Sequence, residues 1–257
     1  MPGFYNPKRT RNLYEPGKPF RISRSKLDLF LKCPRCFYLD RRLGVGQPPS
    51  FPFTLNSAVD KLLKKEFDAY RAKGVPHPSM KGWGVDAVPF AHEKMEEWRD
   101  SLRAGVKYAD PSTGLTLTGG VDDVWINANK ELHIVDYKST AKDGEVNLDA
   151  EWQESYKRQM EVYQWLFRKN NFKVSPIGYF LYCNGRTDLP AFDSKLDFVL
   201  KLIPYRGDDS WVEEALHEAY DCLMQEQVPD SGAECDYCLY RAAAAQAEKE
   251  FSRATGG

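Results

Sequence analysis

An aspartate and a lysine stand two residues apart at the end of an apolar run in the segment ELHIVDYK, residues 131–138. The alternation of apolar side chains is typical of a β-strand and places Asp136 and Lys138 on the same face. A second strand-like run, LTLTGGVDDVWIN, precedes it, and the two runs predict a hairpin with its turn centred on Asn129. In this register Asp122 lies opposite Asp136, with their Cβ atoms about 4.5–5.5 Å apart.

Two carboxylates this close together on a buried sheet repel each other unless a cation lies between them. Asp122 and Asp136 therefore predict a Mg²⁺ or Mn²⁺ site, because these ions bind a few carboxylates and keep open positions for water and phosphate. Lys138 would then orient the attacking water or neutralise charge on a phosphate. The alternative, which the D-x-K tripeptide alone favours, is an ordinary ion pair between Asp136 and Lys138, with Asp122 capping a turn.

Three segments, GGVDD, IVDYKST and KRQMEVYQWL, closely resemble the core of the PD-(D/E)XK nuclease superfamily, and in particular its RecB-like branch. The resemblance covers roughly residues 22–240. It implies metal-dependent hydrolysis of DNA phosphodiesters, with Asp122 and Asp136 as ligands of the divalent metal. Lys138 would be the catalytic cation.

The resemblance extends to the predicted helix after the hairpin, which carries a Q-x-x-x-Y signature at Gln159 and Tyr163. It implies that these two side chains position DNA or the site. RecB-like nucleases usually carry a histidine ligand on an upstream helix, in an L-G-x-x-x-H setting, and the nearest match, LNSAVD, has Asp60 in that place. Asp60 either binds a hard cation through oxygen or is an exposed helix residue, and this departure bears on metal preference and on activity.

Four of the six cysteines form two C-x-x-C pairs, Cys33 with Cys36 and Cys235 with Cys238. In a cytosolic chain such pairs indicate a tetrathiolate metal site rather than disulfides. The site would join the two ends of the domain and, because it closes a loop of about two hundred residues, would stabilise the fold. The alternative is that all four are reduced, unligated thiols.

Four thiolates bind either zinc or an iron–sulfur cluster. The CRISPR-associated and helicase-linked RecB-like exonucleases hold an iron–sulfur cluster with an N-terminal Cys-Pro, which corresponds here to Cys33 and Pro34. This resemblance implies a [4Fe-4S] cluster, with Zn²⁺ as the alternative. Those relatives commonly have three C-terminal cysteines, whereas Ala244 stands at about the place of the third, and Cys36 would compensate. The two remaining cysteines are predicted to be buried free thiols.

Helical periodicity and strand-like alternation predict an α/β domain with a mostly buried sheet. The resemblance implies a restriction-endonuclease-like core, a central mixed β-sheet flanked by helices, with a metal-stapled helical lobe formed by the N- and C-terminal segments. The Gly- and Pro-rich stretch 75–89 is predicted to be a loop. Helices are predicted over residues 25–43 with a break at Pro34, 55–73, 90–103, 151–171 and 209–227 and near the C-terminus, and strands over 115–127, 131–139, 174–184 and 196–205.

The chain is predicted to hold one nuclease domain, residues 22–257, after a basic tail, residues 1–21, with the 75–89 loop as an insertion. Residues 1–42 carry eleven lysines and arginines against three acids, although the whole chain has a net charge of −1. A basic end can steer a polyanion such as DNA, or it can be a solvated segment beside an acidic body. Three arginines near the first cysteine pair are the predicted DNA-contacting residues: Arg35, Arg41 and Arg42.

The length of 257 residues and the hydrophobic content of 42% suffice for a substantial core. No apolar stretch is long enough to predict a signal peptide or a membrane span, so the expected location is the cytoplasm. The predicted function is a metal-dependent deoxyribonuclease, an exonuclease by resemblance, acting on single-stranded DNA or duplex ends; a helicase or CRISPR-adaptation partner follows by analogy only. The alternatives are a catalytically weak DNA-binding module of the same fold and a zinc-stapled protein-interaction domain.

Overall fold

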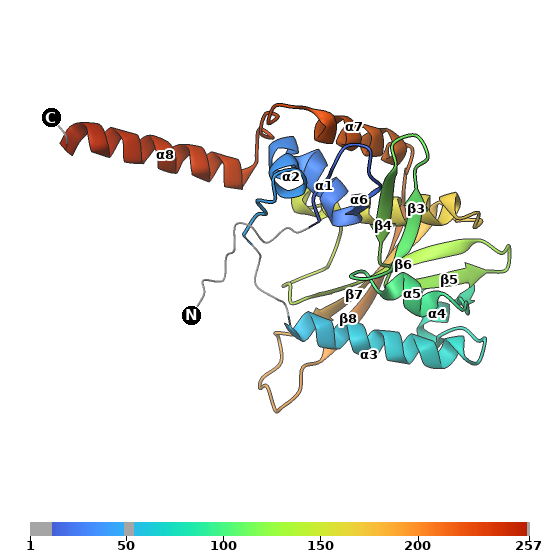
Figure 1. Ribbon diagram of the computed structural model, residues 1–257. Helices are drawn as coiled ribbons and strands as arrows, with labels where there is room; N and C mark the ends of the chain where they lie inside the picture. The colour runs from blue at the N-terminus through green and yellow to red at the C-terminus, as the bar shows by residue number, and fades with distance from the viewer. Residues whose placement is uncertain (1–11, 49–53, 256–257) are drawn as a thin grey trace. The chain divides into compact units, whose positions relative to one another are not determined.

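The computed structural model describes residues 12–48 and 54–255, and Figure 1 labels elements within them where there is room. The helices are α1 (Arg24–Lys32), α2 (Pro34–Arg41), α3 (Thr54–Arg71), α4 (Pro78–Gly82), α5 (Met95–Arg99), the 3₁₀ turn η1 (Glu151–Gln153), α6 (Glu154–Lys169), α7 (Val212–Met224) and α8 (Asp236–Thr255). The strands are β1 (Phe20–Ser23), β2 (Ala87–Pro89), β3 (Val106–Ala109), β4 (Leu115–Gly119), β5 (Asp123–Asn127), β6 (Leu132–Thr140), β7 (Ile177–Gly185) and β8 (Phe198–Arg206).

Five of the strands form a mixed sheet in the order β2-β5-β6-β7-β8, and a smaller sheet has the order β1-β4-β3. In the larger sheet, neighbours run antiparallel except β6 and β7, which are parallel and are joined through α6. β5 and β6 are the predicted hairpin in the predicted register, since Val124 pairs with Ile134. Asp122 immediately precedes β5, at the level of Asp136 in the same register. The predicted fold class, a mixed sheet flanked by helices, is confirmed.

α3 and α6 pack against opposite faces of the five-stranded sheet (Figure 1). Side chains alternate along β6, so Tyr137 points to one face and Asp136 to the other. On the first face Phe67 of α3 stacks on Trp125 of β5, with ring centroids 5.3 Å apart, and lies 5.9 Å from the ring of Tyr137. On the second face Gln159 of α6 donates a hydrogen bond to Asp136. The end of β6 is therefore reached by side chains from both helices.

A buried carboxylate fixes the start of β5. Asp123 is fully buried, and its carboxylate accepts a hydrogen bond from Tyr137 Oη at 2.9 Å. Arg71 and Arg99 form ion pairs with the same carboxylate, and Arg99 Nε also donates to the backbone carbonyl of Asp122 at 3.1 Å. Because a buried charge is tolerated only when it is paired and hydrogen-bonded, this network holds the backbone on which Asp122 is mounted.

The chain divides into two compact units. The first contains α1, α2, α7 and α8 together with the four paired cysteines, and the second contains α3, α6 and the five-stranded sheet. Within the first unit Tyr14, a residue of the predicted tail, is only 3% exposed, whereas its neighbours in residues 12–19 are exposed. Residues 1–11 lie outside the described residues, and the domain boundary at residue 22 stays a prediction.

Some elements differ from the predicted ones. The predicted loop 75–89 contains α4 and the edge strand β2, because Met80 and Ala87 are buried in the core despite the many glycines and prolines around them. The helix predicted over 90–103 is only α5. The predicted strand 115–127 is two strands, β4 and β5, because the chain bends between them, and the four-residue strands β1 and β3 were not predicted.

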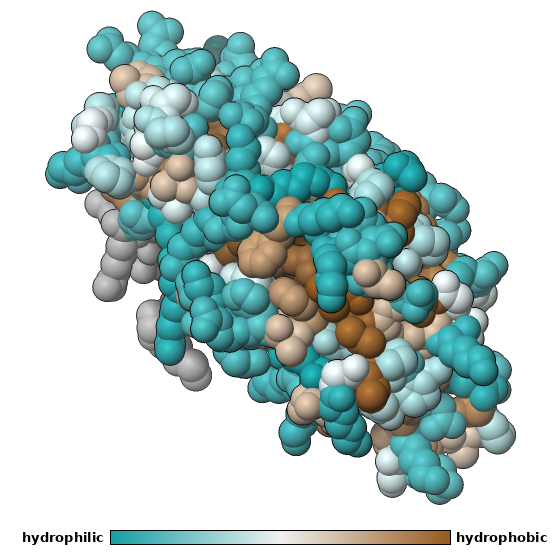
Figure 2. All heavy atoms as spheres, turned by 90° about the vertical axis from the view of Figure 1, so that its right-hand side faces the viewer, coloured by the Kyte–Doolittle hydropathy of each residue, from teal (hydrophilic) through white to brown (hydrophobic). Residues whose placement is uncertain are grey.

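On the face shown in Figure 2, hydrophobic side chains gather in a band bordered by hydrophilic ones, as is common on globular proteins. Among the described residues, the helices are all too short or too polar to span a bilayer.

Candidate functional site

A cleft of about 520 Å³ opens at the end of β6 that carries the D-x-K element. Its lining comes from α3, from α6, from β6 and from the residue that precedes β5. Carboxylates of Asp60 and Asp122 and the ammonium of Lys138 line it, together with the aromatic rings of Tyr137 and Tyr156. The structure therefore gathers three of the predicted site residues around one opening.

Asp60 and Asp122 are joined by Lys64, which was not among the predicted site residues. Lys64 Nζ lies 2.7 Å from Asp60 Oδ1 and 3.1 Å from Asp122 Oδ1. Asp60 and Lys64 are four residues apart on α3, so they share a helix face, whereas Asp122 comes close because α3 packs on the sheet. Asp122 Oδ2 also accepts a hydrogen bond from the backbone N–H of Tyr137 at 2.9 Å. This bond ties Asp122 to the strand that carries the D-x-K element.

Asp136 does not line the cleft and is 1% exposed. Its Oδ2 forms an ion pair with Lys138, and its Oδ1 accepts a hydrogen bond from Gln159 Nε2 at 2.7 Å. Gln159 Nε2 also lies 3.2 Å from Tyr163 Oη. Lys138 Nζ stands 4.2 Å from the centre of the Tyr156 ring, a distance typical of a cation–π contact. Four predicted residues are thus connected in the order Lys138, Asp136, Gln159, Tyr163.

Both lysines of the site are cations. Burial alone would lower the pKa of Lys138, but the charge of Asp136 and a hydrogen bond to it outweigh burial and raise the pKa above its ordinary value. Burial likewise opposes the charge on Lys64, and the neighbouring Asp122 and Asp60 raise its pKa. In this arrangement Lys138 can neutralise a phosphate, but it cannot act as a base at neutral pH.

The two glycines before Asp122 allow close packing around the site. A Cβ on Gly119 would overlap the ring of Tyr163, and one on Gly120 would overlap the side chain and backbone of Ser101. Tyr163 itself is 4% exposed, so its ring has little room to move. The glycines of the GGVDD motif therefore act through packing, and Gly119 lets Tyr163 lie directly on β4.

We expect Gly119→Ala to lower the free energy of unfolding by about 1–3 kcal/mol, since the added methyl group forces the buried Tyr163 ring to shift. Urea unfolding followed by intrinsic fluorescence measures the change. Gly82→Ala is the matched control, because a Cβ at Gly82 meets no atom within 4 Å. If both variants unfold at the same urea concentration as the unsubstituted protein, Gly119 has no packing role.

The donor set of the cleft suits a hard divalent cation. Asp60 and Asp122 line the cleft with carboxylate oxygens, the ligands that Mg²⁺ and Mn²⁺ prefer, and Asp136, the buried partner of Lys138, would be a third ligand. Against these three acids stand only Lys64 and Lys138, so the five groups carry one net negative charge. In the described part of the chain, however, the three carboxylates do not form a group whose ligand atoms all lie within 4.8 Å of one another. A cation shared by them therefore requires the three carboxylates to come closer together, and Lys64 now lies between two of them.

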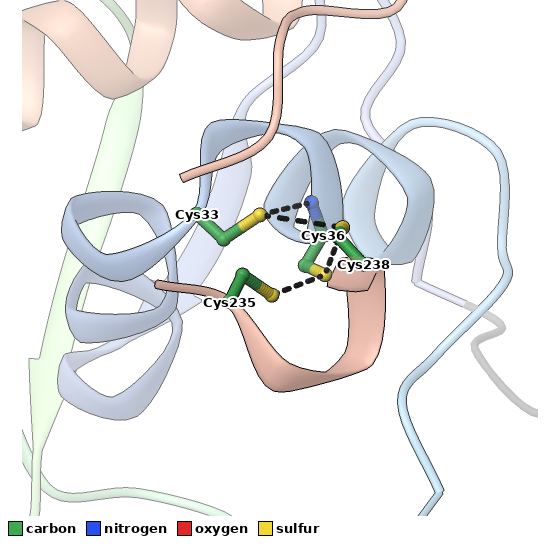
Figure 3. Close-up of side chains that lie close together, drawn as sticks. All are labelled: Cys33, Cys36, Cys235 and Cys238. Carbon is green, nitrogen blue, oxygen red and sulfur yellow. Dashed lines mark hydrogen bonds between the residues drawn. The ribbon is translucent and has the colours of Figure 1, made fainter. Parts of the chain in front are cut away.

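The four paired cysteines converge in the first unit, as Figure 3 shows. Cys36 Sγ lies 3.6 Å from both Cys235 Sγ and Cys238 Sγ, and Cys33 Sγ lies 3.8 Å from Cys238 Sγ. All four sulfur atoms lie within 4.8 Å of one another, and they are the only such group of His, Cys, Asp or Glu side chains in residues 12–48 and 54–255. The predicted grouping of the four cysteines is confirmed, and Cys36 completes the set of four.

Backbone amides prepare the sulfur of Cys33 to be a thiolate. Cys33 lies between α1 and α2, where its sulfur accepts hydrogen bonds from the N–H groups of Cys36 at 3.4 Å and Gly232 at 3.3 Å. Burial alone would raise the pKa of Cys33, but these two N–H groups and the neighbouring thiols lower it to about 7. A thiolate is the form that binds a metal, so Cys33 is prepared to bind one, whereas burial raises the pKa of Cys36 and of Cys238 above its ordinary value.

The three arginines predicted to contact DNA all make contacts within the first unit. Arg35 Nε donates to the backbone carbonyl of Pro229 at 3.0 Å, Arg41 Nε donates to Asp40 at 2.9 Å, and the Arg42 guanidinium lies 5.6 Å from the centre of the Tyr14 ring. These contacts hold the segment that carries the first cysteine pair. A role of the arginines in binding DNA stays a prediction.

The comparison with family profiles finds the superfamily that the hairpin and the following helix resemble. The profile of the PD-(D/E)XK nuclease superfamily matches residues 21–243, a range that includes all the predicted site residues. Among solved structures, one titled "Crystal structure of SSO0001" shares 16% sequence identity at a TM-score of 0.38, with 90% of this chain and 86% of that chain covered. No curated protein matches the chain. Since the profile spans most of its length, the chain belongs to the PD-(D/E)XK nuclease superfamily.

Proposed function

We propose that the protein is a metal-dependent nuclease that hydrolyses DNA phosphodiester bonds in the cleft at the end of β6. The observation that carries this proposal is that Asp60 of α3 and Asp122 and Lys138 of the hairpin region meet around one opening, in a chain of the PD-(D/E)XK superfamily. We propose Asp60, Asp122 and Asp136 as ligands of Mg²⁺ or Mn²⁺. When bound, such an ion supplies positive charge to the phosphate and makes a water molecule more acidic.

The protein's own residues have distinct roles in this proposal. Lys138, fixed by Asp136 and Tyr156, presents a permanent positive charge to the non-bridging oxygens of the phosphate, where negative charge grows in the transition state. Gln159 holds Asp136 through a hydrogen bond, and Tyr163 lies next to Gln159. Both therefore position a ligand and need not touch DNA.

We further propose that the protein is an exonuclease of the RecB-like type, and this part of the proposal rests on the sequence resemblance alone. DNA is proposed as the substrate on the same ground. Nothing in the described residues supports a helicase or CRISPR-adaptation partner, and we propose none.

Cleavage of labelled DNA tests the proposal. Single-stranded and duplex oligonucleotides, each labelled at one end or internally, are incubated with the full-length protein in Mn²⁺, Mg²⁺, Ca²⁺ or EDTA. We expect cleavage in Mn²⁺ or Mg²⁺ and none in EDTA, and the release of single nucleotides from one labelled end indicates an exonuclease. Absence of cleavage in every metal would overturn the proposal.

For the cysteine site, the sulfur spacing supports a single zinc ion. Zinc binds sulfur at about 2.3 Å, so a tetrahedron of thiolates around one zinc has edges of about 3.8 Å. The three sulfur pairs measured in the site are 3.6–3.8 Å apart. A [4Fe-4S] cluster binds each thiolate to a different iron and so spreads the sulfur atoms further apart. We therefore propose zinc, in place of the cluster that the resemblance implies.

One observation favours the catalytically weak alternative. Lys64 lies between two of the proposed ligands and forms an ion pair with each. A divalent ion must displace this ammonium, and the displacement weakens metal binding by the free energy of the two ion pairs. If Lys64 stays in place in solution, the cleft is a site where nucleic acid binds but is not cleaved.

Lys64→Met should tighten Mn²⁺ binding by about tenfold or more, because it removes a positive charge next to the metal position while keeping the length of the side chain. A Mn²⁺ titration followed by the electron paramagnetic resonance signal of free Mn²⁺ measures the dissociation constant without any cleavage. Lys65→Met is the control, since Lys65 is exposed and next to Lys64 in the sequence. Equal Mn²⁺ affinities of the two variants would show that Lys64 does not compete with the metal.

A further inference from the structure

A second cavity, of about 170 Å³, adjoins the cleft. The two share Lys138, Ser139 and Tyr156, so the ring of Tyr156 and the ammonium of Lys138 face both spaces. The rest of the second cavity is lined by the segment between β6 and α6, including Lys142 and Trp152, and by side chains of neighbouring elements. If a phosphate of a nucleic acid lies at Lys138, the adjacent nucleotide can therefore reach this cavity.

The segment that forms this cavity is held by two side-chain amides. Asn184 of β7 accepts a hydrogen bond from the backbone N–H of Lys142 at 2.8 Å and donates one to the carbonyl of the same residue at 2.9 Å. Gln153, which is 5% exposed, donates to the carbonyl of Asn147 at 2.7 Å and accepts from the N–H of Ala150 at 2.9 Å. The cavity wall is therefore formed in the absence of any ligand, which lowers the entropy cost of binding one.

The walls of the cavity are aromatic. Trp152 is 63% exposed, and its ring lies edge-on to that of Tyr156, with centroids 5.4 Å apart and an angle of 85° between the planes. Tyr182 adds a third ring, and its hydroxyl accepts a hydrogen bond from Gln153 at 3.2 Å. A large exposed indole at the mouth of a preformed cavity is the kind of surface on which a nucleobase stacks.

The charges around the cavity favour a polyanion. Lys138 and Lys142 line it. The segment also carries four acids, Asp143, Glu145, Asp149 and Glu151, and none of them lines the cavity; Asp143 accepts a hydrogen bond from Thr187, and Glu145 pairs with Lys201. The charged side chains in the lining itself are therefore lysines.

We propose that this second cavity binds one unpaired nucleobase, that of the nucleotide next to the phosphate at Lys138, stacked on Trp152. The proposal rests on the proposed nuclease function and adds a substrate preference to it. A base inside a duplex must first be unpaired and unstacked, which costs a few kcal/mol. The cavity therefore selects single strands and frayed ends over intact duplex.

Binding to abasic oligonucleotides tests this proposal. The full-length protein, in EDTA to prevent cleavage, is titrated into fluorescein-labelled single-stranded DNA, and each nucleotide in turn is replaced by an abasic one; anisotropy gives the dissociation constants. We expect one abasic position to weaken binding by about tenfold, since stacking of one base contributes about 1–3 kcal/mol. The Trp152→Ala protein should bind the complete oligonucleotide about tenfold more weakly than the unsubstituted protein does. In this variant the abasic replacement should not weaken binding any further.

Phe192→Ala is the matched control, because Phe192 is another exposed aromatic residue of the same unit, at 73% exposure, and lies outside both cavities. Its abasic profile should equal that of the unsubstituted protein. A uniform profile in the unsubstituted protein, or a Trp152→Ala protein that binds like Phe192→Ala, overturns the base cavity even if metal-dependent cleavage is observed. Failure to bind any oligonucleotide, together with failure to cleave in Mn²⁺, overturns the nuclease proposal as well.

Discussion

We expect a Cys33→Ala protein to lose the proposed zinc ion and much of its resistance to unfolding. Structural zinc sites have apparent binding free energies of about 10–16 kcal/mol, and this free energy is folding free energy because the unfolded chain has no preformed site. Removing one of four thiolates should lower the free energy of unfolding by on the order of 5 kcal/mol. Without the metal, nothing at this site joins Cys36 to Cys235 and Cys238, which are about 200 residues further along the chain. Metal analysis by mass spectrometry and urea unfolding measure the two effects.

Cys222→Ala is the control for this substitution. Cys222 is a buried thiol of the same unit but lies outside the group of four, so its loss should cost about 1–2 kcal/mol and leave the metal content unchanged. The unsubstituted protein, purified without oxygen, should be colourless and contain zinc. A broad absorption band near about 400 nm would instead show an iron–sulfur cluster. Equal stability of the two variants would contradict a metal-bound set of four.

The second large effect concerns the cation of the D-x-K element. Lys138→Ala should slow DNA cleavage by about 10²–10³-fold, the usual cost of removing one preorganised group that stabilises developing negative charge. The geometry supports this expectation, since Asp136 on one side and the Tyr156 ring on the other hold the ammonium at the cleft. Single-turnover cleavage at saturating protein measures the step directly, because the rate then no longer depends on binding.

Two comparisons separate a catalytic role of Lys138 from a structural one. Urea unfolding of Lys138→Ala shows whether the loss of the ion pair with Asp136 unfolds the domain, and Lys61→Ala, at an exposed position of α3, controls for the loss of one positive charge. We expect Lys61→Ala to cleave as fast as the unsubstituted protein. Single-turnover cleavage by Lys138→Ala at the unsubstituted rate would show that the cation of the site is another residue.

The hairpin could be predicted from the sequence because the residues that determine it are close together along the chain. Alternating apolar residues and a polar turn at Asn129 determine both the strands and their register, so the pairing of Val124 with Ile134 followed from the spacing alone. The paired cysteines were predictable for a similar reason, since two C-x-x-C motifs have few uses in one chain. The choice between zinc and a cluster depends on distances between sulfur atoms, and no spacing in the sequence contains them.

The ion pairs of the cleft could not be predicted in the same way. The spacing of Asp60 and Lys64 along one helix face was visible, but the contact of Lys64 with Asp122 joins residues 58 positions apart and exists only because α3 packs on the sheet. The sequence contains one further signal, the aspartate Asp123 directly after Asp122. Two neighbouring aspartates at a strand start alternate in direction, so one faces the cleft and the other needs buried cations, here Arg71 and Arg99.

Every role proposed for the cleft depends on Asp60, Asp122 and Asp136 binding one divalent cation beside Lys138. Crystals grown with Mn²⁺ and measured at a wavelength where manganese scatters anomalously test this binding. We expect an anomalous peak about 2.1 Å from oxygens of these carboxylates, with the Lys64 ammonium moved out of the space between Asp60 and Asp122. A map without such a peak, in which Lys64 still bridges the two aspartates, would contradict it.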